Sequence, residues 1–335
     1  MTKSQINFKK IKSQNIFGVL RFSFLLGFAI WALGFGSASA YTIEKLNFSN
    51  EGDIVVGPGK TELWLDPGGS STQEMVVSNR SGVPKIINIS VEDFEGTSNP
   101  EETIQFLNDK TSPYSLKNFV KPEVNQITLQ FGERLRLPVV VNIPAGTEPG
   151  GLYGAVMISA SNVPEPGASI ASNTAAGKVK VITRVASLFF VRINGKANEA
   201  GQLSGFKALK SFYEAGPVDF QIALKNEGSV HLSPYGTIEV KNILGQKVDE
   251  REVDPWFVMP KSERTREIKW NSNFLFGRYT ATLFMNRGYG DIIDQKSFSF
   301  WVIPWRLVSM ILIGLILVIW FIIWIASHFE LKKKQ

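Results

Sequence analysis

The sequence predicts an all-β protein: two tandem immunoglobulin-like β-sandwich domains followed by a single transmembrane helix. Three observations predict this class. From Tyr41 to Ile303 the chain consists of short runs of β-branched and aromatic residues separated by Gly, Pro, Asn and Asp, the pattern of strands and turns. Landmarks of the first half recur in the second half. Near the end, twenty consecutive residues from Leu307 to Ala326 carry no charge.

Residues 1–40 have the three parts of a secretory signal peptide. Positions 1–21 carry five basic residues and no acidic one, and a fourteen-residue apolar run follows from Phe22 to Phe35. Ala38-Ser39-Ala40 has the small side chains of a cleavage site. We expect the mature chain to begin at Tyr41; an uncleaved anchor is the alternative.

The uncharged stretch near the end predicts a membrane-spanning helix over residues 304–328. Twenty residues at about 1.5 Å each match a bilayer core of roughly 30 Å, and the stretch has no polar face. Tryptophans flank both of its ends, as in interfacial belts. The basic tail, residues 329–335, contains Lys332–Lys334, so the positive-inside rule predicts a cytoplasmic C-terminus and an extracellular ectodomain.

The net charge of +6 at pH 7 comes from these topology signals. Between Tyr41 and Ile303 there are 27 Lys and Arg against 29 Asp and Glu. A nucleic-acid-binding domain needs a basic surface, so we expect no nucleic-acid partner. The chain has no cysteine, and an exported ectodomain that folds without disulfides favours a bacterial source.

The first domain is predicted to cover residues 41–197. Its strands are expected at Thr61–Leu65, Gln73–Ser78, Lys85–Phe94, Ile127–Phe131, Leu135–Ile143, Tyr153–Ala160 and Lys178–Asn194. The last of these is long and mostly apolar, which is typical of a strand buried between two layers.

The second domain is predicted to cover residues 198–303, with seven strands, the number in an immunoglobulin-like sandwich. They are expected at Leu203–Phe212, Val218–Lys225, Gly236–Lys241, Lys247–Val253, Glu263–Trp270, Arg278–Met285 and Gln295–Val302.

The two domains share landmarks. Gly151-Leu152-Tyr153-Gly154-Ala155 matches Gly277-Arg278-Tyr279-Thr280-Ala281, and an Asn ends an early strand in each, at Asn79 and Asn226. We expect both asparagines to hold turns and both tyrosines to pack inward with the hydroxyl on a backbone group.

Spacing between these landmarks indicates two inserts in the first domain. One lies between Gly96 and Gln126, and Ser112-Pro113 within it predicts one or two helical turns. The other is an Asn162–Gly177 loop. With sandwiches about 35 Å tall standing end to end, this loop is expected roughly 70 Å from the membrane and the first insert at the joint between the domains.

The residues that commonly carry catalysis are scarce. With two histidines, His231 and His328, and no cysteine, no zinc site or Ser-His-Asp arrangement of ordinary spacing is possible. The acidic run from Glu92 to Glu95 lacks the spacing of a calcium loop and is interpreted as a solvated strand end. We therefore expect no enzyme activity, no cofactor and no metal.

Aromatic side chains give the candidate ligand-binding residues. Tyr114 and Phe119 lie in the first insert, and Trp256 and Phe257 follow an Asp-Pro turn in the second domain. If exposed, such rings form platforms for sugars or anchors for proteins. The alternative is that they close the ends of the sandwiches or the joint between the domains.

The order of these segments resembles the WxL-interacting proteins of Gram-positive cell surfaces. The motifs that carry the resemblance are Leu65-Asp66-Pro67-Gly68, Val91-Glu92-Asp93-Phe94, Ser112-Pro113-Tyr114-Ser115-Leu116, Pro149-Gly150-Gly151-Leu152-Tyr153-Gly154-Ala155, Met259-Pro260-Lys261-Ser262 and Gly277-Arg278-Tyr279-Thr280. The resemblance implies a first domain similar to a peptidoglycan-binding module and a second domain that binds proteins.

The sequence therefore predicts a membrane-anchored bacterial envelope protein that binds peptidoglycan or another cell-wall polymer, surface proteins, or both. One alternative is a structural scaffold subunit of an envelope complex without glycan binding. Another is a membrane-tethered chaperone that adds a strand of its client to an open sheet edge.

Overall fold

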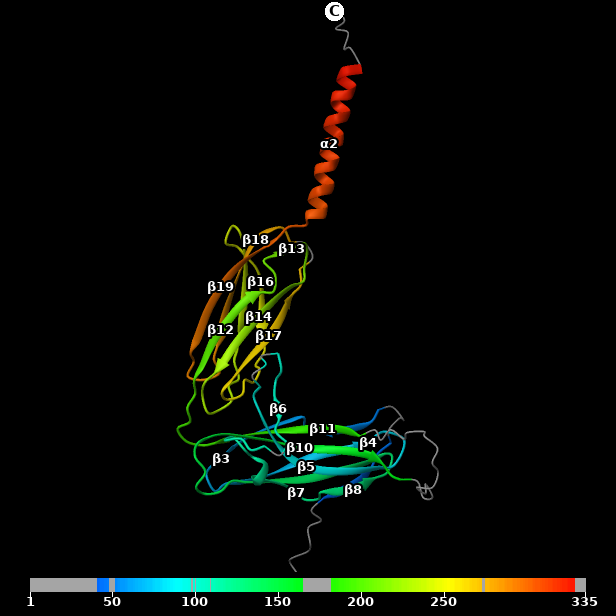
Figure 1. The fold of residues 1–335 in the computed structure, drawn as a ribbon, viewed down its shortest axis with the longest axis vertical. Helices are drawn as coiled ribbons and strands as arrows, with labels where there is room; N and C mark the ends of the chain where they lie inside the picture. Colours follow the sequence, from blue (N-terminus) through cyan, green and yellow to red (C-terminus); the bar gives the residue numbers. More distant parts are fainter. Residues whose placement is uncertain are drawn as a thin grey trace, which may run out of the picture.

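The computed structural model describes residues 41–47, 52–97, 99, 101–108, 110–164, 182–272 and 275–328. The predicted signal peptide, most of the Asn162–Gly177 loop and the basic tail lie outside these ranges and stay predictions. In the described part the chain is almost entirely β, with one long apolar helix at its C-terminal end (Figure 1).

The first half of the chain forms two sheets. Sheet I has the order β1-β9-β4-β2 with β7 also on β9, and sheet II has the order β3-β11-β10-β5-β6 with β8 also on β5. The elements are β1 (Thr42–Lys45), β2 (Ile54–Gly57), β3 (Lys60–Leu65), β4 (Ser70–Asn79), β5 (Lys85–Glu95), β6 (Gln105–Phe106), the 3-10 helix η1 (Lys117–Phe119), β7 (Val120–Pro122), β8 (Gln126–Leu129), β9 (Glu133–Asn142), β10 (Gly150–Asn162) and β11 (Thr183–Ile193).

The second half also forms two sheets, III with the order β12-β14-β17 and IV with the order β13-β19-β18-β15-β16. The elements are β12 (Gly201–Ala208), β13 (Phe212–Tyr213), β14 (Val218–Asn226), β15 (Tyr235–Asn242), β16 (Lys247–Val253), β17 (Ser262–Trp270), β18 (Gly277–Asn286), β19 (Ile293–Val302) and the helix α2 (Trp305–His328).

Strand pairing repeats between the halves. β3 pairs parallel with β11, and β13 pairs parallel with β19. β10 pairs antiparallel with β11 and β5, as β18 does with β19 and β15. The recurring sequence landmarks therefore reflect a repeated pairing order.

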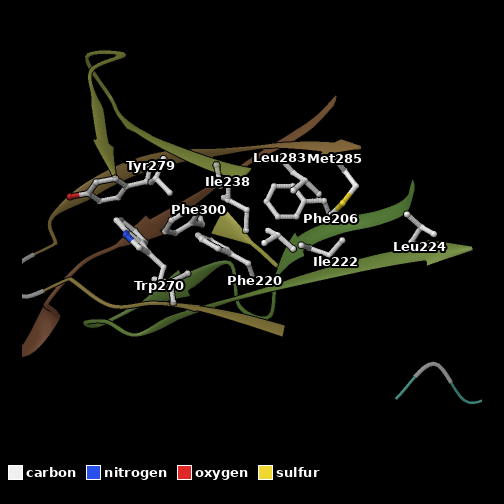
Figure 2. Close-up of a cluster of buried hydrophobic side chains, with 14 of the residues drawn as sticks. Phe206, Phe220, Ile222, Leu224, Ile238, Trp270, Tyr279, Leu283, Met285 and Phe300 are labelled. Atoms are coloured by element: carbon white, nitrogen blue, oxygen red, sulfur yellow. The ribbon is translucent and has the colours of Figure 1, made fainter. Parts of the chain in front are cut away.

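Each half has its own apolar core. Leu137, Val156 and Phe189 belong to the core between sheets I and II. Phe220, Trp270 and Phe300 belong to the core between sheets III and IV, where their rings pack closely (Figure 2). The two cores share no buried residue, so each half buries its own apolar surface.

Sheet II is buried on both faces near its centre. Phe189 and Val191 of β11 point into the core of the first half, whereas Phe190 between them belongs to a third cluster with Tyr153 and Met259. All three residues of β11 are fully buried. The prediction that this apolar strand lies between two layers is confirmed for its described part, β11, and the second covering layer comes from the other half of the chain.

The two halves do not stand end to end. The outer face of sheet II, rather than an end of its sandwich, contacts the second half. In Figure 1 the strands of the first half accordingly run across the long axis of the molecule, and those of the second half run along it. The end-to-end arrangement, from which the loop was expected to lie roughly 70 Å from the membrane, is therefore wrong. The insert between Gly96 and Gln126 does reach the joint, as predicted, through Ile104 and Tyr114.

Helix α2 follows β19 after only Ile303 and Pro304. The Ile303 N–H donates to the Tyr213 carbonyl oxygen at 2.8 Å, and the Val308 N–H donates to the Pro304 oxygen at 3.0 Å. The chain is thus hydrogen-bonded through the strand-to-helix transition. Residues Trp305–Ile325 form a helix long and apolar enough to cross a membrane, and none of it is buried against the rest of the described chain.

Candidate functional site at the joint

The contact region between the two halves, called the joint, contains three aromatic rings on the outer face of sheet II. Phe94, Tyr153 and Phe190 come from β5, β10 and β11, and their centroids lie 5.4 to 6.0 Å apart. The second half covers them with Phe257 and His231, each with its ring centroid 5.0 Å from that of Phe190. Edge-to-face aromatic contacts of this kind hold the two halves together.

Tyr153 ties the halves together with a hydrogen bond as well. The backbone N–H of His231 donates to the Tyr153 hydroxyl oxygen at 2.6 Å, and the His231 Nδ1 lies 3.3 Å from the same oxygen. Burial raises the pKa of the Tyr153 phenol well above its usual value. The tyrosine therefore stays protonated and acts as a structural hydrogen-bonding group.

Burial also lowers the pKa of His231 to about 4. Its Nε2 lies 3.8 Å from a carboxylate oxygen of Glu62, which alone would favour the charged form. Desolvation is the larger effect, so the imidazole is neutral at pH 7 and the contact with Glu62 is not an ion pair.

Gly151 makes room for the Tyr153 ring. A Cβ built at Gly151 would lie 2.0 Å from the Tyr153 hydroxyl oxygen. The corresponding Gly277 has free space around it but a φ of +107°, a conformation that favours glycine. Glycine is therefore favoured for different physical reasons at the two positions: lack of space at Gly151 and a positive φ at Gly277.

The tyrosines of that motif also differ. The prediction that both hydroxyls bind backbone groups is confirmed, because Tyr279 accepts a hydrogen bond from the Phe276 N–H at 3.2 Å. However, Tyr279 belongs to the core between sheets III and IV, whereas Tyr153 faces the joint. The prediction of inward packing is therefore confirmed for Tyr279 and wrong for Tyr153, which points out of its own sandwich toward the second half.

Asp93 positions the insert at the joint. Its Oδ1 accepts from the backbone N–H groups of Leu116 and Lys117 at 3.0 and 2.8 Å, and Ser115 Oγ donates to Oδ2 at 2.5 Å. Asp93 is 2% exposed, so the interpretation of this carboxylate as part of a solvated strand end is wrong. It holds the segment that carries Tyr114. The helical turn expected after Ser112 is present but begins later, as the 3-10 helix η1 (Lys117–Phe119).

A cavity of about 300 Å³ opens beside Tyr114. Its lining combines the Tyr114 ring with the Thr147–Leu152 segment before and at the start of β10, and Ser229 supplies the wall from the second half. One half-buried aromatic ring beside the polar side chains of Thr147, Glu148 and Ser229 suits a sugar or a short extended peptide.

The four predicted ligand residues separate into two pairs. Tyr114 and Phe257 are half-buried at the joint. Phe119 packs on the core of the first half, and Trp256 is buried in the core of the second. None is an exposed platform, so the premise of exposure is wrong. Tyr114 alone lines the cavity.

Phe257 is held between two cations. Lys60 Nζ lies 5.0 Å from its ring centroid, and the Arg264 guanidinium carbon lies 4.8 Å from it. Arg264 also donates to the Phe257 carbonyl oxygen at 2.6 Å. The Lys60 contact crosses from the first half to the second and so links them, whereas Arg264 fixes Phe257 within the second half.

The sequence did not identify several exposed aromatic side chains, among them Phe212, Phe276 and Trp64. Trp64 on β3 is 61% exposed, and β3 is an edge strand that pairs only with β11 in the described part of the chain. Its position in an apolar strand run concealed it, since strand alternation alone does not distinguish an edge from a centre. The described residues contain no group of three or more His, Cys, Asp or Glu side chains placed to hold a metal ion.

No protein-family model and no curated protein matches the chain. Among solved structures it is similar to the class 5 fimbriae chaperone CfaA, with 13% identity, a TM-score of 0.35, and coverage of 75% of this chain and 100% of that one. It is also similar to a chaperone–tip adhesion subunit complex of Csu pili from Acinetobacter baumannii, with 10% identity, a TM-score of 0.35, and coverage of 74% of this chain and 98% of that one. The E. coli chaperone DraB is similar with 14% identity, a TM-score of 0.33, and coverage of 74% of this chain and 96% of that one. Fold and function therefore rest on the chain's own geometry.

Proposed function

We propose that the protein is a single-span bacterial cell-envelope protein that binds cell-wall polymer, surface proteins, or both, and has no enzyme activity. Its ectodomain comprises two tandem immunoglobulin-like domains, residues 41–197 and 198–303. The resemblance to WxL-interacting proteins supports the same function, with peptidoglycan as the wall polymer.

The observation that carries the proposal is that an unburied apolar helix is connected directly to the β ectodomain. Helix α2 leaves β19 with no linker, and the joint between the halves is closed by aromatic, cation–π and hydrogen-bond contacts. Such a molecule holds the joint cavity at a fixed place above a membrane. The basic tail orients the ectodomain outward.

The joint cavity is the proposed ligand site. Tyr114 offers an aromatic ring, and the side chains of Glu148 and Ser229 in the lining offer polar groups, which together suit a glycan or its stem peptide.

Co-sedimentation of the purified ectodomain, residues 41–303, with wall sacculi tests this proposal. Binding is expected, and Tyr114→Leu should weaken it about tenfold because the stacking face is lost. Phe131→Leu is the matched control, since Phe131 is 36% exposed and lies at the β8–β9 turn, away from the joint. Equal loss in both variants removes the cavity as the site, and absence of binding by the ectodomain to sacculi and to surface-protein extracts overturns the proposal.

A second candidate is binding of a protein segment along β3. The open edge of this strand and the exposed Trp64 suit strand addition by an extended peptide. Capture of a surface protein that Trp64→Ala abolishes and Tyr114→Leu leaves unchanged would assign function to this edge.

A further inference from the structure

The strand register brings several distant segments to one end of the second half. Gly277 of β18 pairs with Val302 of β19, and Asn242 of β15 pairs with Tyr279. Phe212 of β13 pairs with Trp301. The turn after β15, the loop before β18 and strand β13 therefore all lie at the end from which α2 leaves (Figure 1).

Large apolar side chains are exposed on these segments, at the end of β19 and at the start of α2. Six of them are between 39% and 77% exposed, and we call them the rim: Phe212, Ile243, Leu244, Phe276, Trp301 and Trp305. Scattered apolar residues are normal on a protein surface, but a group of this size at one end of a domain marks an interaction surface.

The turn between β15 and β16 is ordered with its apolar residues outward. The Asn242 side-chain oxygen accepts from the backbone N–H groups of Leu244 and Gln246, both at 3.0 Å, and Gly245 supplies a φ of +78°. Ile243 and Leu244 are nevertheless 69% and 77% exposed at the tip. Turns usually carry polar residues at such positions, so the two aliphatic side chains lack a partner within the described fold.

The length of α2 places the rim at the membrane surface. The apolar segment Trp305–Ile325 has 21 residues. At about 1.5 Å per residue it is about 32 Å long, which nearly equals the roughly 30 Å hydrocarbon core. The helix has no spare length, and Trp305 lies only three residues after Val302 of β19. The end of the second half must then lie at the level of the lipid headgroups.

We infer that the rim inserts into the headgroup region of the bilayer that α2 spans, so that the ectodomain meets the membrane over an apolar surface as well as through one helix. This inference rests on the proposed membrane anchorage. Trp and Phe side chains suit this region, where one part of the ring is apolar and the other is wet.

Two features beside the helix fit a lipid surface. A cavity of about 380 Å³ lies between Phe212, Tyr213 and Trp305, where the apolar rim leaves a hollow at the start of α2. Arg306 forms an ion pair with Glu214 at 3.2 Å, which neutralises a carboxylate at this level. At the α2 end, the second half thus exposes aromatic rings and aliphatic groups. The Glu214 carboxylate at this end is paired with Arg306.

Single-cysteine labelling tests the inference, because the native chain has no cysteine. The full chain carrying Leu244→Cys, labelled with an environment-sensitive fluorophore, is reconstituted in nanodiscs of phosphatidylcholine and phosphatidylglycerol that contain nitroxide-labelled phosphatidylcholine. Tyr235→Cys is the matched control, at the other end of β15 and about 25 Å away along the strand. Ile316→Cys, in the middle of α2, reports whether the helix is inserted.

We expect the Leu244→Cys label to lose most of its emission to the nitroxide lipids, with a blue-shifted spectrum, while the Tyr235→Cys label is unaffected. Quenching at Ile316→Cys together with no more quenching at Leu244→Cys than at Tyr235→Cys overturns the rim inference and leaves the anchor standing. Absence of quenching at Ile316→Cys overturns the anchorage itself, and the rim inference with it.

Discussion

Asn79 and Asn226 hold equivalent turns in the two halves. Each is fully buried, and each side-chain amide donates to two carbonyl oxygens while its oxygen accepts from the N–H two residues later. The sequence predicted this role from the position of an Asn after a strand.

We predict that Asn226→Ala destabilises the ectodomain by about 2–3 kcal/mol, because buried groups lose their partners. Asn88→Ala is the control, since Asn88 is exposed and its change should stay within about 0.5 kcal/mol. Denaturant unfolding of the ectodomain measures both. Equal values for the two variants would contradict the assignment of Asn226 as a buried turn anchor.

Gly151→Ala should destabilise the joint by about 1–3 kcal/mol, because the new methyl group occupies the place of the Tyr153 hydroxyl. Gly146→Ala is the matched control, since nothing lies within 4 Å of the added Cβ there. Thermal unfolding distinguishes them, and an unchanged midpoint for Gly151→Ala refutes the close approach.

His231 predicts a pH dependence of stability. Its folded-state pKa of about 4 lies below the ordinary value of 6.5, so the unfolded chain binds the proton more readily. The stabilising contribution is complete above about pH 6.5 and is lost as pH falls toward 4, at most about 3 kcal/mol.

The measurement compares the free energy of unfolding at pH 7.5 and 4.5 for the native ectodomain and for His231→Gln. The native protein should lose more stability between pH 7.5 and 4.5, because only it has the buried His231 to protonate. The carboxylates titrate in both proteins and contribute alike to each. A parallel loss in the two proteins would mean that His231 is solvated rather than buried at the joint.

The site was only partly predictable at the scale of single residues. Trp256 and Phe257 are adjacent, yet one enters a core and the other enters the joint. An aromatic pair in a turn carries no signal of which side chain faces which layer. One partner that decides it, Lys60, lies on the distant strand β3, and the other, Arg264, lies on the next strand, β17.

At the scale of elements, strand patterning predicted every long strand of the second half. The observed β16 coincides with the expected Lys247–Val253, and the others differ by a few residues at their ends. The sequence missed β1, β2, β6, β7 and β13, which have two to four residues each. Strands so short carry little periodicity, and pairing with a neighbouring strand defines them.

The insert of the first half depends on one buried carboxylate. Asp93→Ala should release the segment from Ser112 to Phe119, because two backbone N–H groups and the Ser115 hydroxyl lose their acceptor. Limited trypsin digestion of the ectodomain should then cut early at Lys110 or Lys117. Glu95→Ala, which removes an exposed contact with Gln105, serves as control and should leave these sites protected; early cutting in both variants would show that Asp93 has no special role.

At the scale of the whole molecule, the sequence predicted the order of β units and apolar helix but not their angle. The crossed arrangement follows from Phe94, Tyr153 and Phe190 on the outer face of sheet II, which alternate with core residues and looked like ordinary strand residues. Burial of both faces of a sheet depends on where the next unit packs, which a local pattern does not encode.

The crossed arrangement also sets the layout on which the proposed function rests. The rim and α2 lie at one end of the second half, and the joint cavity lies at the other end, against the first half. All of this depends on α2 as a membrane anchor with the ectodomain outside.

Protease accessibility in cells tests that anchor most directly. Cells expressing the full chain with a C-terminal tag are stripped of wall and treated with protease. We expect the ectodomain to be degraded while a tagged fragment of α2 and the tail survives until the membrane is permeabilised. Loss of the tag together with the ectodomain in intact cells, or release of the full chain from membranes by carbonate, would contradict it.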